Sequence, residues 1–198
     1  MKSALIVVAV MFAFIVGASS SLQTDKAKQS SDTLEKMRQL DLLNQILPLV
    51  MTKDQIRQLL PTIEKARRDV KAEEDTEAGL IAQVAPEINA AVKAGIEKGE
   101  VPDKALLKKA NAVIRTMAMR RNAIASDNVD MVLGEMKKIL NAGQLKAAAN
   151  SLSTSVYMPD VKPEEIKDDQ KLQIFVREIM LDPLAYDILV KLQKGPIG

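Results

Sequence analysis

The chain has 198 residues, 47% of them hydrophobic, and a formal charge of only +2. Because it is nearly neutral, it has no general electrostatic attraction for nucleic acid or anionic lipid. It contains no histidine and no cysteine, which excludes disulfides, zinc or copper sites of the common kind, and the usual general base near neutral pH. We therefore expect no catalytic group, no metal and no cofactor.

The first twenty residues have the layout of a secretory signal. Lys2 supplies a positive start, an apolar run follows over 4–16, and small residues follow at 17–20. A membrane anchor is the less favoured alternative, because the run is shorter than the roughly 20 residues that span a bilayer. We expect a signal over 1–20, cleaved at Ser20 or nearby, export to the periplasm or the medium, and a flexible lead-in over 21–31.

A helical core domain is expected over 32–152. Asp32 can cap its first helix, with Glu35 three residues later as the partner in a capping box. Apolar residues then recur at helical spacing: Leu34, Met37, Leu40, Leu43 and Leu47. Pro48 disfavours helix at the residue before it, so this element is expected to end there.

A second helix begins with the most specific pattern in the chain. Thr52 is its predicted N-cap and Gln55 stands at the third helical position, while Met51 and Ile56 are placed as a hydrophobic staple. The apolar face continues to Ile96 across two prolines, Pro61 and Pro86. An interior proline costs about 3 kcal/mol, so we expect a kink near Pro61 and a second one at Pro86 rather than a break.

The middle of this helix is densely charged. Residues 64–75 contain nine charged side chains, which we interpret as a solvated helix face with ion pairs at three- and four-residue spacing. Residues 98–103 form the clearest turn, and a stripe of helical period then runs from Lys104 to Leu140, interrupted at Arg121 and Asn128. A helix of that length spans roughly 55 Å.

The helix-start pattern occurs a second time. Asn141 is the predicted cap with Gln144 as its partner, and Leu140 and Leu145 form the staple. A linker is expected over 153–162. A C-terminal helical extension packed on the core is expected over 163–193, with a helix from Asp160 or Lys162 to Leu181 and a last helix restarting at Asp182. No segment alternates as a strand does. The predicted fold is all-α, with long antiparallel helices in an extended hairpin or bundle and smaller C-terminal helices.

The doubled helix start resembles the LTxxQ motif of the Spy/CpxP-like periplasmic stress proteins. The first copy reads Met51-Thr52-Lys53-Asp54-Gln55 and the second reads Leu140-Asn141-Ala142-Gly143-Gln144, with Met in place of Leu and Asn in place of Thr. The resemblance covers roughly 33–152 and implies a hairpin-like helical fold, often a cradle-shaped homodimer, and ATP-independent chaperone or envelope-stress roles. Some relatives bind metal through histidine, which this chain lacks.

Two sets of side chains are candidates for binding clients. The methionines Met117, Met119, Met131 and Met136 cluster on the long helix, and methionine surfaces adapt to many partners. The alternative is that they fill a core poor in aromatic residues. Arg120 and Arg121 can pair with acidic clients, or instead bridge to Asp and Glu on a neighbouring helix.

These observations predict an exported, non-enzymatic, all-helical protein with chaperone-like or envelope-stress binding. The alternative is a structural or assembly protein of the envelope that pairs its helices with a fixed partner. A hydrolase built on paired carboxylates is the least favoured hypothesis. The partners expected are proteins, with a homodimer as a further option, and neither nucleic acid nor stable membrane insertion after cleavage.

Overall fold

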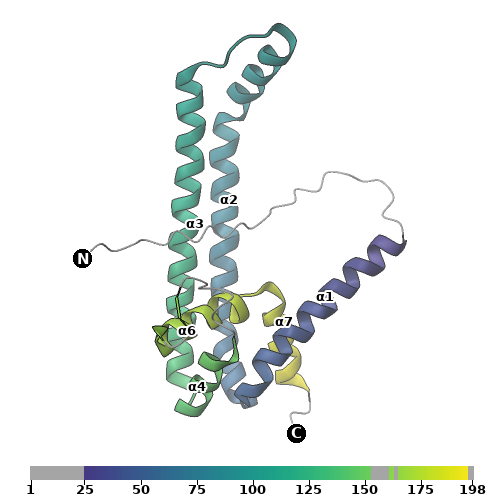
Figure 1. Cartoon of the computed structure of the whole chain (residues 1–198), viewed down its shortest axis with the longest axis vertical. Coiled ribbons are helices and arrows are strands. Elements are labelled where there is room, and N and C mark those ends of the chain that lie inside the picture. Colours follow the sequence, from purple (N-terminus) through teal and green to yellow (C-terminus); the bar gives the residue numbers. More distant parts are fainter. Residues whose placement is uncertain (1–24, 153–160, 163–164, 196–198) are drawn as a thin grey trace, which may run out of the picture. The chain divides into compact units, whose positions relative to one another are not determined.

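The computed structural model describes residues 25–152, 161–162 and 165–195. Its elements are α1 (Asp25–Ile46), the 3-10 turn η1 (Leu47–Leu49), α2 (Lys53–Lys98), α3 (Lys104–Ile139), α4 (Ala142–Ser151), α6 (Asp168–Phe175), the π-helical η3 (Val176–Met180) and α7 (Pro183–Lys194). The predicted all-α fold is confirmed: two long helices form a hairpin and smaller helices follow (Figure 1). The predicted signal and most of the predicted linker lie outside the described residues.

The chain divides into two compact units, Met1–Glu35 and Lys36–Gly198. The described part of the first unit is the beginning of α1, where Thr33 Oγ1 donates a hydrogen bond to the carbonyl of Gln29 at 2.8 Å. Asp32 lies inside this helix, so the prediction that it caps the first helix is wrong. The helix begins seven residues earlier because Lys, Ala and Gln, which are good helix formers, precede Asp32 without a glycine or proline.

In the second unit, α1 packs through the face that contains Arg38, Leu42 and Ile46. Leu42 and Ile46 are buried, whereas Met37, Leu40 and Leu47 of the predicted apolar series are exposed. Arg38 Nε donates to Asp182 Oδ2 at 2.8 Å and Arg38 Nη2 donates to the carbonyl of Glu178 at 2.9 Å. This guanidinium therefore ties α1 to the chain between η3 and α7.

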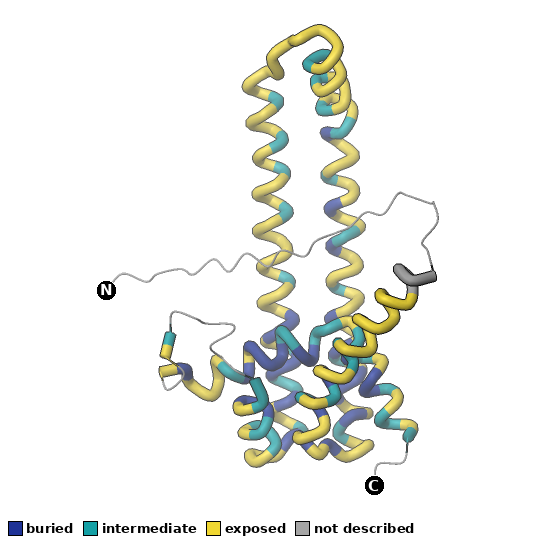
Figure 2. Tube along the Cα trace, turned by 45° about the vertical axis from the view of Figure 1, so that its right-hand side comes forward, coloured by how far each residue is buried: buried dark blue, intermediate teal, exposed yellow. Residues whose placement is uncertain are grey.

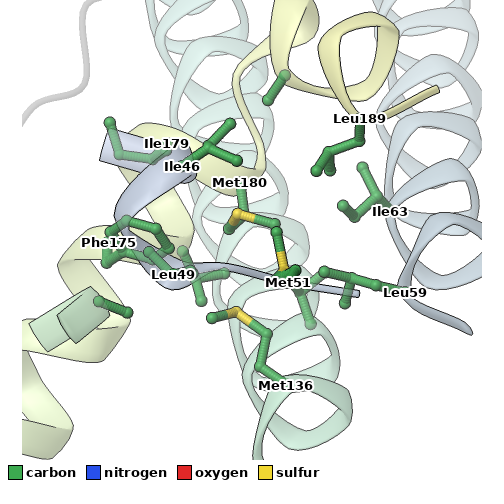
Figure 3. Close-up of a cluster of buried hydrophobic side chains, with 14 of the residues drawn as sticks. Ile46, Leu49, Met51, Leu59, Ile63, Met136, Phe175, Ile179, Met180 and Leu189 are labelled. Atoms are coloured by element: carbon green, nitrogen blue, oxygen red, sulfur yellow. The ribbon is translucent and has the colours of Figure 1, made fainter. Parts of the chain in front are cut away.

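We call residues 36–69, 127–152 and 165–195 the base, because they enclose the hydrophobic core. The core draws side chains from α1, η1, α2, α3, α4, α6, η3 and α7. Figure 3 shows its centre, where Met51 and Met180 lie close together among aliphatic side chains. Its fully buried members include Leu42, Ile46, Leu49, Leu59, Ile63, Met136, Phe175 and Leu189. The C-terminal helices belong to this core, since α7 packs against α2 and α6 packs against α4.

The C-terminal helices begin at definite residues. The helix predicted from Asp160 or Lys162 starts at Asp168 instead; Lys162 is not helical, and Asp160 lies outside the described residues. Asp182 caps α7, because its Oδ1 accepts a hydrogen bond from the amide of Leu184 at 2.9 Å and Pro183 occupies the first helical position.

We call the hairpin of residues 70–126 the arm. It consists of the far part of α2, the turn at 99–103 and the first two thirds of α3, which lie side by side (Figure 1). α2 continues through Pro61 and Pro86 without a break, and Figure 1 shows it changing direction towards its tip, in the part that contains Pro86. Gly99 ends the helix with a φ of 69°, a conformation that glycine adopts readily.

Burial differs sharply between base and arm. Figure 2 shows buried residues concentrated in the base and sparse along the arm. All arm residues are described, and Val84 is the only buried apolar side chain among them. The arm is therefore held by a thin seam of half-buried side chains together with the ion pairs described below.

Candidate functional site

The first helix start is a complete capping box. Thr52 has extended backbone angles, φ −71° and ψ 159°, and its Oγ1 accepts a hydrogen bond from the amide of Gln55 at 3.1 Å. In return, the amide of Thr52 donates to Gln55 Oε1 at 2.9 Å. Met51 and Ile56, which flank the cap, are both buried in the base. Two amides that the helix leaves without partners are thereby satisfied.

The second helix start repeats this arrangement at α4. Asn141 Oδ1 accepts a hydrogen bond from the amide of Gln144, and the amide of Asn141 donates to Gln144 Oε1, both at 3.0 Å. Leu140 is buried, and Leu145 is partly buried against the core. The asparagine thus performs the capping function that threonine performs in the first copy.

The two helix starts bind one another. Gln55 Nε2 and Gln144 Oε1 are 3.0 Å apart, and so are Gln144 Nε2 and Gln55 Oε1. Gln55 Nε2 also donates to the carbonyl of Ile139 at 2.8 Å, and Gln144 Nε2 donates to the carbonyl of Val50 at 3.2 Å. Each of these carbonyls lies two residues before the other helix's cap. We call this reciprocal arrangement the glutamine pair.

The glutamine pair requires glutamine on both sides. Each carboxamide oxygen accepts from its own cap and from its partner, while each carboxamide nitrogen donates to the partner and to a carbonyl. A glutamate has no N–H to donate and an asparagine is one methylene shorter. The pair joins the two ends of the α2–α3 hairpin at the base and supplies no group suited to acid, base or nucleophilic chemistry.

Val50 adopts a strained backbone next to the glutamine pair. Its φ is 46° and its ψ is 47°, which is the left-handed region, and it is the only non-glycine residue with positive φ among those described. A β-branched residue rarely adopts this conformation. The conformation closes η1 and presents the Val50 carbonyl to Gln144. No residue type in the sequence signals it, since valine is among the least expected residues here.

The four candidate methionines do not form one surface. Met136 is fully buried in the base and Met131 is partly buried against the core, while Met117 is half-buried and Met119 is 69% exposed. Met136 therefore cannot contact a client in the folded chain, and the methionine set as a client-binding face is corrected to a single exposed side chain. The cause is that the stripe containing Met136 turns into the base core.

Arg120 and Arg121 bridge to the neighbouring helix, which was the alternative considered for them. Arg120 Nε and Nη2 donate to the two carboxylate oxygens of Glu73 at 2.6 and 2.8 Å. Arg121 binds both oxygens of Glu77 in the same two-pronged way. Hydrogen bonding to Glu73 raises the pKa of Arg120, and hydrogen bonding to Glu77 raises that of Arg121, so both arginines stay charged.

The sequence interpretation missed the buried carboxylates of these pairs. Pairs such as Glu64–Arg68 at 3.2 Å and Lys65–Asp69 at 2.5 Å follow the predicted solvated spacing. Glu73, however, is only 5% exposed, so the charged stretch is not wholly a solvated face, and Glu77 beyond it is equally buried. The spacing of these residues could have indicated their burial. Buried residues recur on α2 at 66, 73, 77 and 84, and spacings of seven and four are typical of a packed helix face.

One side of the arm is polar. It carries the Arg120–Glu73 pair and a bond between Lys109 Nζ and Glu87 Oε1 at 2.5 Å. A cleft of about 360 Å³ lies where this side meets the base, lined by Asp69, Ala72, Glu73, Thr76, Arg120, Ile124, Asp127 and Asn128. Within the described ranges, no three acidic side chains are grouped in a way that could hold a metal ion.

The other side of the arm is apolar and exposed. We call it the apolar strip, and its members are 46% to 80% exposed: Val70, Ile81, Val92, Ile96, Leu107 and Ile114. On α2, Val70, Ile81 and Val92 are spaced by eleven residues. Eleven residues make three helical turns plus about 20°, so these side chains project in nearly the same direction. On α3, Ile114 and Arg121 are seven residues apart and therefore lie on one helix face, and on α2 the same holds for Glu77 and Ile81, which are four apart. Arg121 binds Glu77 across the hairpin. The α2 and α3 members therefore share one side of the hairpin.

No helix in the described part of the chain is both long and apolar enough to cross a membrane. Comparisons of the chain with protein-family models, with curated proteins and with solved structures find no match.

Proposed function

We propose that this is an exported, non-enzymatic protein that binds apolar segments of other proteins through the arm, without nucleotide, in a chaperone-like or envelope-stress role. The observation that carries the proposal is the apolar strip. Its six aliphatic side chains remain exposed on two helices that ion pairs hold together: Lys109–Glu87 and Arg120–Glu73 on the polar side, and Arg121–Glu77 beside the strip.

Exposure of this kind is informative because the residues are contiguous along the arm. Single exposed aliphatic side chains are ordinary, but a row of them marks a surface that binds another molecule. On α2 between Ala78 and Ile96 the charged residues are Glu87, which binds Lys109 on the polar side, and Lys93, which binds Glu97 at 4.0 Å. A bound apolar segment would remove the side chains of the strip from water at little desolvation cost.

The glutamine pair supports the resemblance to the Spy/CpxP-like proteins. The two motif copies that suggested the resemblance contact each other directly, through the glutamine that each motif contains. A shared structural reason for both copies makes chance repetition a poorer explanation. Membership of that family, and homodimer formation with it, remain part of the proposal.

Export is proposed from the signal-like segment over 1–20. The chain has no cysteine that an oxidising compartment would modify, and its stability relies on packing in the base. Expression of the full chain in a bacterial host, followed by fractionation and N-terminal sequencing, tests this. A mature chain that begins near residue 21 outside the cytoplasm is expected, and an uncleaved cytoplasmic chain contradicts it.

Suppression of client aggregation tests the binding function. The mature chain at several-fold excess is expected to suppress aggregation of a chemically denatured client without ATP, and Ile81→Gln/Ile114→Gln to weaken that suppression. Thr76→Gln/Thr116→Gln, also on exposed arm positions, is the matched control and should behave as the parent chain. Absence of suppression by the parent chain rejects the proposal.

A second candidate function is assembly with one fixed helical partner. The regular spacing of the apolar strip favours it, because spacings of seven and eleven residues suit a single long helix. Crosslinking in the native host separates the two: one stoichiometric partner favours assembly, and many weak partners favour a chaperone.

A further inference from the structure

The arm half of α3 carries charge of one sign. Residues 104–126 contain six cations and no Asp or Glu: Lys104, Lys108, Lys109, Arg115, Arg120 and Arg121. Lys109, Arg120 and Arg121 are matched by carboxylates of α2. Lys104, Lys108 and Arg115 are exposed, and no carboxylate of the described residues forms a salt bridge with them. Three positive charges are thus left over on one helix.

These three cations lie along one edge of the apolar strip. They are spaced by four and seven residues, so they project in nearly the same direction from α3. Leu107 of the strip lies three residues after Lys104, a spacing that makes the two side chains neighbours on the helix surface. The opposite edge, on α2, has Ala78, Ala82 and Asn89, followed by Lys93, which binds Glu97 at 4.0 Å. The strip therefore has three cations along its α3 edge that form no salt bridge with the described residues, while the cation on its α2 edge is paired.

Within the described residues, two local effects disfavour this arrangement. Lys104 and Lys108 occupy the first two turns of α3, where the helix dipole favours acidic side chains. Their mutual repulsion at four-residue spacing is also unfavourable. A binding partner with complementary charge would turn both costs into attraction.

We propose, building on the function proposed above, that the arm binds an amphipathic helix with an apolar face and acidic residues along one edge. The apolar face would cover the strip and the acidic edge would lie beside Lys104, Lys108 and Arg115. A helix is the expected form because α2 and α3 offer side chains but no free backbone groups. An extended segment would leave its own N–H and C=O groups without partners on the dry surface. Contact along 81–96 corresponds to a helix of about 16 residues.

The charges argue against a second arm as the occupant. Its α3 has no acidic residue in 104–126, and every carboxylate of its α2 between Val70 and Lys98 is already in a salt bridge. Glu73 and Glu77 bind Arg120 and Arg121, Glu74 and Asp75 bind Lys71, and Glu87 and Glu97 bind Lys109 and Lys93. A second copy would have to give up one of these pairs for each contact with the cations.

Fluorescence anisotropy of labelled helical peptides tests the proposal on the full mature chain. Three peptides of 18 residues would share one leucine face and differ along one edge, which carries Glu, Gln or Lys. The Glu peptide is expected to bind about tenfold tighter than the Gln peptide, as three exposed ion pairs allow, and the Lys peptide weakest. Added salt should abolish the difference.

Charge-removal variants locate the effect. Lys104→Gln/Lys108→Gln/Arg115→Gln should bind the Glu and Gln peptides equally and keep its affinity for the Gln peptide. Lys53→Gln/Lys146→Gln/Lys194→Gln, which removes three exposed cations of the base, should keep the tenfold preference. Circular dichroism of both variants establishes that they fold.

Equal binding of the three peptides by the parent chain overturns the proposal. So does a preference for the Glu peptide that survives in Lys104→Gln/Lys108→Gln/Arg115→Gln, which we call the arm variant. A second binding experiment uses vesicles of anionic phosphatidylglycerol. Binding to them that the arm variant loses, without any peptide preference, overturns the proposal in favour of a lipid surface. If the parent chain suppresses aggregation but does not discriminate between peptides, only this inference fails, and failure in both assays removes the proposed function as well.

Discussion

The base and the arm are built from the same two helices but are stabilised in different ways. In the base, α2 and α3 contribute side chains that are almost completely removed from water, such as Leu59 and Met136. In the arm, the same helices bury one apolar side chain, Val84, together with the carboxylates of Glu73 and Glu77. The core of the base extends no further along α2 than Ala66.

The difference shows how one hairpin can combine stability with an exposed binding surface. The core of the base contains no arm residue, because α1, α4, α6 and α7 close it around the base portions of α2 and α3, so we expect its stability to depend little on the arm. The arm can keep aliphatic residues in water because two-pronged ion pairs help to hold its helices together. The following predictions test this division, from the largest effect to the smallest.

A core truncation in the base is expected to have the largest effect. Phe175 is fully buried, and Phe175→Ala should lower the free energy of unfolding by about 3–5 kcal/mol. Ile114→Ala in the arm, where the side chain is 62% exposed, should change it by about 0.5 kcal/mol or less. Urea denaturation followed by circular dichroism measures both. Similar losses for the two variants would contradict the division.

The glutamine pair comes next. Gln55→Ala removes bonds to the Thr52 amide, the Ile139 carbonyl and Gln144, and should cost about 2–3 kcal/mol. Gln170 provides a control, since among the described residues its side chain accepts a hydrogen bond only from the amide of Lys167, at 3.0 Å; Gln170→Ala should cost about 1 kcal/mol. A double-mutant cycle of Gln55→Ala with Gln144→Ala should show coupling of about 1 kcal/mol. Additive losses would mean that the two helix starts act independently.

The arm's ion pairs should stabilise the arm locally. Glu73→Gln weakens a two-pronged contact and is expected to cost about 1–2 kcal/mol, seen as faster hydrogen exchange over 104–126 with little change in the base. Replacing both partners, in Glu73→Leu/Arg120→Leu, should recover most of that loss, because no unpaired charge is left. If the double variant is less stable than Glu73→Gln, the ion pair itself makes a net contribution to the stability of the arm.

The pH response of these pairs follows from the arginines. Because Glu73 and Glu77 raise the pKa of Arg120 and Arg121, the stabilisation is fully present below the arginine pKa of the unfolded chain. It is lost only as the pH rises through the still higher value of the folded chain. Arm exchange, corrected for its intrinsic pH dependence, should therefore not change between neutral and moderately alkaline pH.

The last prediction concerns the one substitution expected to stabilise the chain, at Val50. Its φ of 46° is unfavourable for a β-branched residue, so Val50→Gly should raise the free energy of unfolding by about 1 kcal/mol. The gain is limited because glycine also gives the unfolded chain more freedom. Val50 is 76% exposed, so little packing is lost. Thermal denaturation measures the change, and a lower midpoint would show that the valine side chain stabilises the turn.

Features encoded by neighbouring residues could be predicted from the sequence. Thr52 with Gln55, and Asn141 with Gln144, each act over three residues, so the pattern alone indicates the bonds. The same local rule failed at Asp32, where good helix formers upstream extend the helix past a box-like pair. A local pattern therefore predicts a cap only where the preceding residues disfavour helix.

Features that depend on contacts distant in the sequence could not be predicted. Gln55 and Gln144 are 89 residues apart, and nothing in either motif indicates that they meet. Burial of Glu73 contradicts the general preference of carboxylates for water, and becomes understandable only once Arg120 is seen opposite. Met136 and Met119 lie on one helix, yet the position of the base core buries the first and leaves the second exposed.

The glutamine pair has a consequence for the connectivity of the chain. The turn at 99–103 joins α2 to α3 at the tip of the arm, far along both helices from the base, and all five of its residues are exposed. Each half of the polypeptide on either side of that turn brings one glutamine and part of the core. A chain cut at Glu100 should therefore reassemble from two separately produced fragments, so that the tip is a natural position for an inserted reporter or a split-protein design.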